Sequence, residues 1–141
     1  MASKPKKIFI HSSVLIAYID RGSVNHLKAS KLIDDMAAMG CRLYTSTLGI
    51  GETYNKLVPQ VGITVALEFL QVIFQSNIEI LFPQKSDLIT AYRILKTNRN
   101  EKLSFIEALK ATLMQRKGID QVLTFDTWNQ LFGITKSQLA V

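Results

Sequence analysis

Polar residues that could perform chemistry stand directly after two apolar runs rich in β-branched and aromatic residues. His11 follows the run 7–10 (KIFI), and Asp126 follows the run 122–125 (VLTF). Such runs predict buried strands, and the carboxyl ends of strands in an open α/β sheet border the crevice where ligands bind. We therefore expect His11 and Asp126 to share one rim of a sheet.

Two further acidic residues are expected at the same rim. Glu52 lies about one and a half turns into a helix after the second predicted strand, and Glu107 lies in the first turn of the helix before the fourth. Three carboxylates in one crevice repel each other, and Mg²⁺ or Mn²⁺ usually compensates because these cations prefer oxygen ligands. Glu52, Glu107 and Asp126 are thus predicted metal ligands. The cation would activate a bound water and neutralise charge on a scissile phosphate.

Each of the four residues also has a structural explanation that needs no ligand. Glu52 is spaced to form an i,i+4 ion pair with a lysine, and Glu107 fits the last position of a capping box. Asp126 could cap the turn that follows it. His11 could be a core histidine bonded to a backbone carbonyl. The placement of all four on one rim favours the functional explanation over these.

The elements that must position these residues alternate between strands and helices, which predicts a parallel sheet with helices on both faces. The fold class is therefore α/β, a three-layer α/β/α arrangement with a central parallel sheet of four to five strands. Strands are predicted over 7–10, 43–46, 78–82 and 122–125, with an edge strand near Ile134. Helices are predicted over 24–39, from 46 or 47 to about 57 before Pro59, over 63–75 and 86–98, and from 104 to near 118. An earlier helix, directly after the first strand, should be capped by Ser12 or Ser13, and Asp126 should open a short helical turn.

The composition predicts one globular domain with a polyanionic partner. The chain has 141 residues, interpreted as a basic tail over 1–7 and a single domain over 8–141. Its net charge of +6 favours nucleic acid as partner. The single cysteine, Cys41, excludes an internal disulfide and suits the reducing cytoplasm. No stretch approaches the ~18 apolar residues of a membrane helix, so no membrane association is expected.

Three segments together resemble the PIN domains of VapC-type toxins. They are IFIHSSVLIAYID, TSTLGIGETYNKL and LSFIEALKATLMQRKGIDQVLTFD, and the resemblance extends over residues 7–135. It implies an α/β/α fold, three or four acidic residues that bind Mg²⁺ or Mn²⁺, cleavage of RNA, and an antitoxin protein that wraps the domain. The positions that match the catalytic residues of the family are His11, Glu52, Glu107 and Asp126, with Ser12 and Thr124 matching hydroxyl residues that line the site.

His11 is the serious departure from this family pattern, because the resemblance implies an Asp at that position. An imidazole suits Zn or Fe better than Mg. Three accounts of His11 stay open: it ligates Mn²⁺ in a weakened enzyme, it is protonated and replaces the metal as an internal cation, or it is a change selected or introduced during expression, since an active toxin harms its host. We expect a PIN-type metal-dependent endoribonuclease, the toxin of a toxin–antitoxin pair, that is weakened or inactive in this chain. The alternative is a noncatalytic RNA- or protein-binding module with the same fold.

Two surface features are predicted to meet partners. The helix over 63–75 is apolar nearly all round, which indicates either a core position or a contact with a second copy in a homodimer. Basic residues around the last two long helices could follow an RNA backbone, or could be an ordinary solvated face. They are Arg93, Lys96, Arg99, Lys102, Lys110, Arg116 and Lys117.

Overall fold

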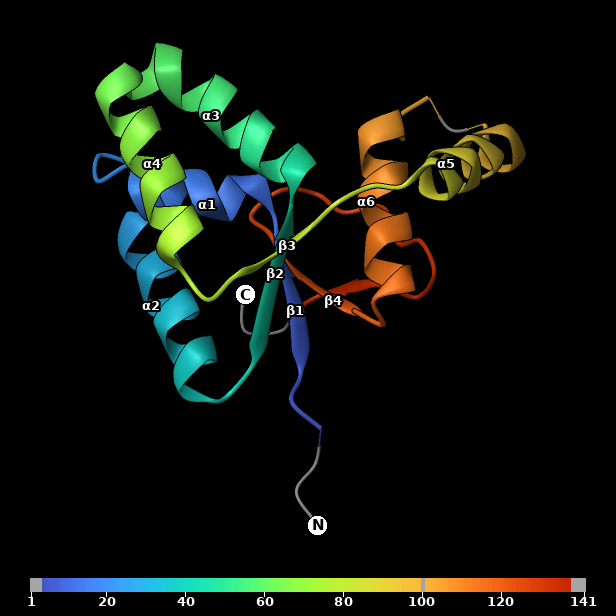
Figure 1. Cartoon of the computed structure of the whole chain (residues 1–141), viewed down its shortest axis with the longest axis horizontal. Coiled ribbons are helices and arrows are strands. Elements are labelled where there is room, and N and C mark those ends of the chain that lie inside the picture. Colours follow the sequence, from blue (N-terminus) through green and yellow to red (C-terminus); the bar gives the residue numbers. More distant parts are fainter. Residues whose placement is uncertain (1–3, 100, 138–141) are drawn as a thin grey trace.

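A central sheet of five parallel strands organises the computed structural model, which describes residues 4–99 and 101–137 (Figure 1). The strand order is β3-β2-β1-β4-β5. The strands are β1 (Lys7–Ile10), β2 (Arg42–Ser46), β3 (Glu79–Leu81), β4 (Gln121–Leu123) and β5 (Thr135–Lys136). The predicted sheet of four to five parallel strands is confirmed.

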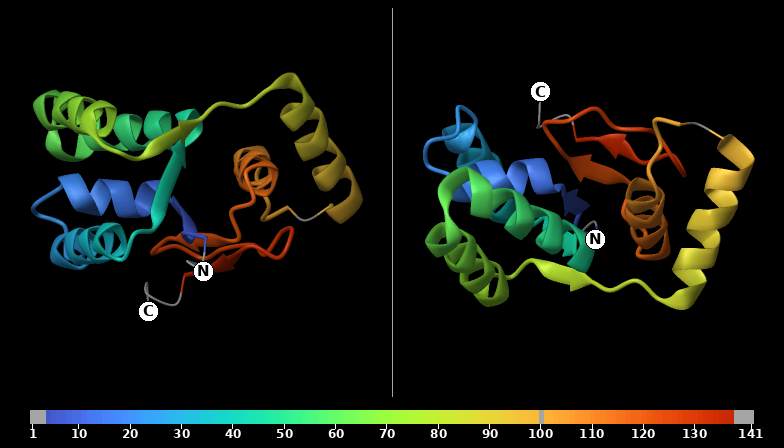
Figure 2. Two further views of the ribbon diagram at one scale, coloured as in Figure 1. Left: turned by 60° about the horizontal axis from the view of Figure 1, so that its bottom comes forward. Right: turned by 90° about the horizontal axis from the view of Figure 1, so that it is seen from above.

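Helices cover both faces of this sheet. They are α1 (Ser12–Ile19), α2 (His26–Ala38), α3 (Thr47–Val61), α4 (Ile63–Gln75), α5 (Lys85–Asn98) and α6 (Phe105–Arg116). Helices α1 to α4 lie together on one side, and α6 lies on the other with α5 packed outside it (Figures 1 and 2). The predicted three-layer α/β/α arrangement is therefore confirmed.

The central strand β1 shows why both faces are covered. Successive side chains of a strand point to opposite faces. Ile8 and Ile10 pack in the core formed with α1 to α4, and Phe9 packs in the core formed with α6. All three are fully buried. An uninterrupted apolar run is what a strand with two buried faces requires.

The order of the strands places a switch point of the sheet beside His11. From β1 the chain moves outward through β2 to β3, and it then returns to place β4 on the opposite side of β1. The connections leave β1 and β4 in opposite directions, which is the kind of switch point where open α/β sheets bind ligands. His11 follows β1, and Thr124 follows β4 at the same end of the sheet.

Three local predictions were wrong. Helix α3 does not stop before Pro59 but continues to Val61, because its packing on neighbouring helices outweighs one lost backbone hydrogen bond near its end. Gly62, at a φ of +98°, then ends it. His11, and neither of the two serines after it, caps α1. Asp126 lies in a bend and opens no helical turn.

Part of the predicted basic tail belongs to the sheet. Residues 1–3 of the predicted basic tail lie outside the described residues. Lys7, the last residue of that tail, belongs to β1, and its Nζ donates to the carbonyl oxygen of Lys117 at 2.8 Å. Among the described residues, no helix has the length and apolar character needed to cross a bilayer.

Candidate functional site

His11 is held in place by the start of helix α1. Its Nδ1 accepts a hydrogen bond from the backbone N–H of Ser13 at 3.1 Å, which satisfies one of the unpaired donors of the first turn. Its own backbone N–H donates to the carbonyl oxygen of Leu123 on β4 at 2.9 Å. The imidazole therefore performs the capping role that an Asp carboxylate at this position would also perform.

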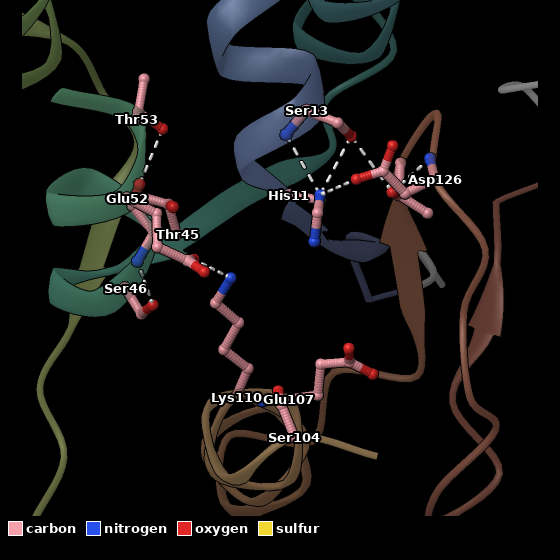
Figure 3. A network of polar contacts seen from close by, with 12 residues as sticks. His11, Ser13, Thr45, Ser46, Glu52, Thr53, Ser104, Glu107, Lys110 and Asp126 are labelled. Atoms are coloured by element: carbon pink, nitrogen blue, oxygen red, sulfur yellow. Dashed lines mark hydrogen bonds and ion pairs between the residues drawn. The ribbon is translucent and has the colours of Figure 1, made fainter. Parts of the chain in front are cut away.

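Hydroxyl groups join the start of α1 to the loop after β4 (Figure 3). Ser13 Oγ lies 3.0 Å from His11 Nδ1 and 3.2 Å from Thr124 Oγ1, and it accepts from the backbone N–H of Phe125 at 3.1 Å. Thr124 Oγ1 accepts from the N–H of Asp126 at 3.0 Å. Ser13, which was not among the predicted site residues, makes these contacts, whereas Ser12 is buried at the first residue of α1. Thr124 lies at the predicted place.

The imidazole of His11 is neutral in the folded protein. Burial and, to a smaller extent, the positive charge of Lys110 lower the pKa of His11 to about 4, although Asp126 and Glu52 act in the opposite direction. His11 Nδ1 lies 3.9 Å from Asp126 Oδ2, a distance that would suit an ion pair with a protonated ring. The Ser13 N–H occupies the lone pair of that same nitrogen, so we assign the neutral form. A neutral imidazole does not support the account in which a protonated His11 replaces the metal.

This neutral state predicts how stability depends on pH. Between about pH 6.5 and pH 4 the unfolded chain binds a proton at His11 and the folded chain does not, so acidification lowers the free energy of unfolding. The contribution is fully present above about pH 6.5. The loss should reach about 2 kcal/mol by about pH 4.5, at roughly 1.4 kcal/mol per pKa unit.

Urea unfolding of the wild type and of His11→Asn at about pH 7 and pH 4.5 measures this contribution, since Asn can cap a helix but does not titrate. The variant should lose less stability on acidification than the wild type. An identical loss in both proteins would contradict the assignment of a neutral, buried His11.

Lys110 forms an ion pair with Glu52 across the crevice (Figure 3). The Nζ of Lys110, on α6, donates to Oε1 of Glu52, on α3. Lys110 is 1% exposed, and the Glu52 side chain is 35% exposed. Lys110 was predicted among the basic residues that could follow an RNA backbone, and that prediction is wrong for this residue. A buried lysine cannot be part of a solvated face.

The other two acidic residues lie on the far side of the crevice. Asp126 is exposed, and it approaches His11 as described above. Glu107 lies in the first turn of α6, and its backbone N–H donates to the Oγ of Ser104, the N-cap residue, at 3.0 Å. The Glu107 carboxylate accepts from Asn129 Nδ2 at 2.8 Å. The structure therefore brings Glu52 and Asp126 into the electrostatic environment of His11 and gives Glu107 a separate partner.

This donor set does not fit a divalent metal. A hard cation needs several free oxygen ligands, but Glu52 is paired with an ammonium group and Glu107 with an amide. His11 offers nitrogen and no oxygen, and one of its two ring nitrogens, Nδ1, already accepts a hydrogen bond from the Ser13 N–H. Over residues 4–99 and 101–137, no three His, Cys, Asp or Glu side chains are grouped so that they could hold a metal ion. The predicted metal set of Glu52, Glu107 and Asp126 is not assembled as a ligand cage, and we derive no step through a metal.

The sequence around Lys110 is itself typical of a buried lysine. The helix reads FIEALKATLMQR, and Lys110 is the lone charge among Ala108, Leu109, Ala111 and Leu113, all of which are buried. A lysine surrounded by apolar residues on every side of a helix has no solvent face to point to. Such a lysine indicates a buried charge, and a buried charge requires a partner of opposite sign.

The fold of this chain is similar to that of solved VapC-type toxin structures. No family model and no curated protein sequence matches the chain. Solved structures do match it. The crystal structure of VapC20 from Mycobacterium tuberculosis, a sarcin-ricin loop cleaving toxin, has a TM-score of 0.75 at 24% identity, over 84% of this chain and 89% of that one. The crystal structure of VapBC2 from Rickettsia felis, bound to a DNA fragment from the promoter, has a TM-score of 0.60 at 15% identity, over 85% and 88%. The resemblance inferred from the sequence is thus confirmed at the level of the fold.

Proposed function

We propose that this chain is an RNA-directed protein of the VapC-type PIN class, a class of metal-dependent endoribonucleases, in which Mg²⁺- or Mn²⁺-dependent cleavage is weakened or lost. The observation that carries this proposal is the neutral His11 at the switch point of the sheet, where the family pattern implies a carboxylate. Two contacts support the proposal: His11 Nδ1 lies 3.9 Å from Asp126 Oδ2, and the Lys110–Glu52 ion pair leaves too few free oxygen ligands for a metal.

RNA is the proposed ligand because of charge and of the structural neighbours. The net charge is +6, and one neighbour is described as a sarcin-ricin loop cleaving toxin, so a structured RNA is the first substrate class to test. On α5 and after it, Arg93, Lys96 and Arg99 are exposed and could contact phosphates. We further propose an antitoxin-type partner protein and a cytoplasmic location.

RNA binding and RNA cleavage can be measured separately on a structured RNA hairpin. The wild type should bind the hairpin with an affinity that falls as salt is raised. Cleavage should be weak or absent with Mg²⁺ and with Mn²⁺, and absent with EDTA. Arg93→Ala should weaken binding and reduce the salt slope by about one, whereas Lys31→Ala on α2, across the sheet, should not. Rapid Mg²⁺-dependent cleavage by the wild type, or salt-insensitive binding, would contradict the proposal.

A noncatalytic binding module is the second candidate, and the Lys110–Glu52 ion pair favours it. A carboxylate that is neutralised by a buried lysine has lost the free oxygen that a catalytic metal ligand must offer. Under this candidate, RNA binding persists while no cleavage is found with any cation. A low level of Mn²⁺-dependent cleavage would favour the weakened enzyme instead.

A homodimer is proposed from the surface of α4. The buried face of this helix consists of Ala66, Phe69 and Ile73, whereas Leu67 and Phe74 are exposed. Exposed apolar side chains on a helix indicate an interaction surface. A mass from light scattering tests this proposal, and a monomer at all protein concentrations would refute it.

A further inference from the structure

The position of the Lys110 ammonium group relative to the acidic side chains is the basis of a further inference. Lys110 extends from α6 into the crevice, with Glu52 on one side and His11 with Asp126 on the other (Figure 3). A cation shared by these acidic groups would have to lie in the same space. Lys110 therefore occupies the location in which the sequence predicted a divalent metal.

The burial of Lys110 requires an explanation based on charge. A lysine normally keeps its ammonium group in water by extending its long side chain. Here the side chain is 2% exposed, and the ammonium group is paired with a carboxylate. Burying a charge is costly unless a partner of opposite sign compensates it. Lys110 and Glu52 compensate each other, and the pair connects α3 to α6 across the end of the sheet.

A metal ion and this ammonium group exclude each other. A divalent cation bound to Glu52 would contact the carboxylate that Lys110 Nζ already contacts. Two cations at such a short separation repel strongly in a partly buried site. The net charge around Glu52 also differs from that of a site with an Asp at position 11. The neutral imidazole of His11 contributes no negative charge, and the ammonium group of Lys110 adds a positive one. Both differences weaken the electrostatic attraction of this site for a cation.

We propose that Lys110 is a built-in cation that takes the place of a divalent metal at the carboxyl end of the sheet, so that this crevice keeps its acidic groups together without binding Mg²⁺ or Mn²⁺. The inference rests on the proposed function in that it concerns the same crevice. Metal binding is measured without RNA, so a failure of RNA recognition and a failure of this inference give different results.

Mn²⁺ titrations followed by electron paramagnetic resonance on the full chain test the proposal. The wild type should not bind Mn²⁺ at millimolar concentration. Lys110→Met keeps the length of the side chain and removes its charge, and in combination with His11→Asp it should raise Mn²⁺ affinity at least tenfold. The melting temperature of the double variant should also rise with added Mn²⁺. Lys110→Arg keeps the charge and should still exclude the metal.

Lys56→Met combined with the same His11→Asp change is the matched control, because Lys56 lies one turn after Glu52 on α3 but is exposed. This control has the same net charge as the first double variant and should gain far less Mn²⁺ affinity. An equal gain in this control would overturn the proposal, as would a first double variant that gains no affinity.

A measurement on the wild type covers the case in which Lys110→Met does not fold. In NMR spectra, the amide signals of Ser13 and Thr124 should not broaden selectively when Mn²⁺ is added. Selective broadening of these signals at submillimolar Mn²⁺ would overturn the proposal.

Discussion

Replacing His11 by Asp and Lys110 by Met in one protein is expected to raise Mg²⁺-dependent RNA cleavage by about 100-fold over the wild type, a gain that EDTA should abolish. The first change restores an oxygen ligand and keeps the helix cap, since Asp is among the best capping residues. The second removes the ammonium group that is paired with the Glu52 carboxylate, so that this carboxylate can bind a cation. A divalent cation supplies several kcal/mol of charge stabilisation in such sites, and each 1.4 kcal/mol corresponds to about tenfold in rate.

The single variants separate the two obstacles to cleavage. His11→Asp alone should give a much smaller gain, because Lys110 still neutralises Glu52. Adding Asp126→Asn to the double variant should remove the gain again. If His11→Asp alone reached the full rate, Lys110 would not be an obstacle. If the double variant stayed inactive while it bound Mn²⁺, the noncatalytic module would be the better description.

The second large effect concerns stability and lies away from the crevice. Arg116→Met is expected to lower the free energy of unfolding by about 3 kcal/mol, because it leaves the buried carboxylate of Asp87 without its cation. The Asp87 side chain is 4% exposed, and it accepts two hydrogen bonds from Arg116, at 3.1 Å and 3.0 Å. Arg116 also donates to the carbonyl oxygen of Phe82 at 3.1 Å. The pair connects the start of α5 to the end of α6.

The matched control for this prediction is the exposed ion pair between Lys31 and Asp35 on α2. Its Nζ–Oδ2 distance of 3.0 Å equals the shortest distance of the buried pair, but both side chains are exposed. Lys31→Met should therefore cost about 0.5 kcal/mol or less. Urea unfolding of both variants at pH 7 measures the difference, and similar losses in the two would show that burial does not strengthen the Arg116–Asp87 pair.

Much of the architecture could be predicted from the apolar pattern. The helix over 63–75 was placed at the bounds that the structure gives it, and the first strand was found because a run such as KIFI suits a strand with both faces buried. The wrong predictions share a cause. Pro59 was expected to end α3, but packing on neighbouring helices outweighs its local preference. Ser12 or Ser13 was expected to cap α1, but the imidazole of His11 reaches the N–H of Ser13.

For the candidate site, the sequence by itself determined which acidic residues stand near the ends of the strands, because the apolar period that marks each strand and its position along the chain are local properties. It did not determine which charges meet. Lys110 and Glu52 are 58 positions apart, and only the packing of α6 and α3 against the sheet brings their side chains together. Tertiary structure decided that Lys110 is buried and that His11 is neutral. The physical reason is that the energy of a charge depends on its solvation and its neighbours in space, and neither can be read from its position in the chain.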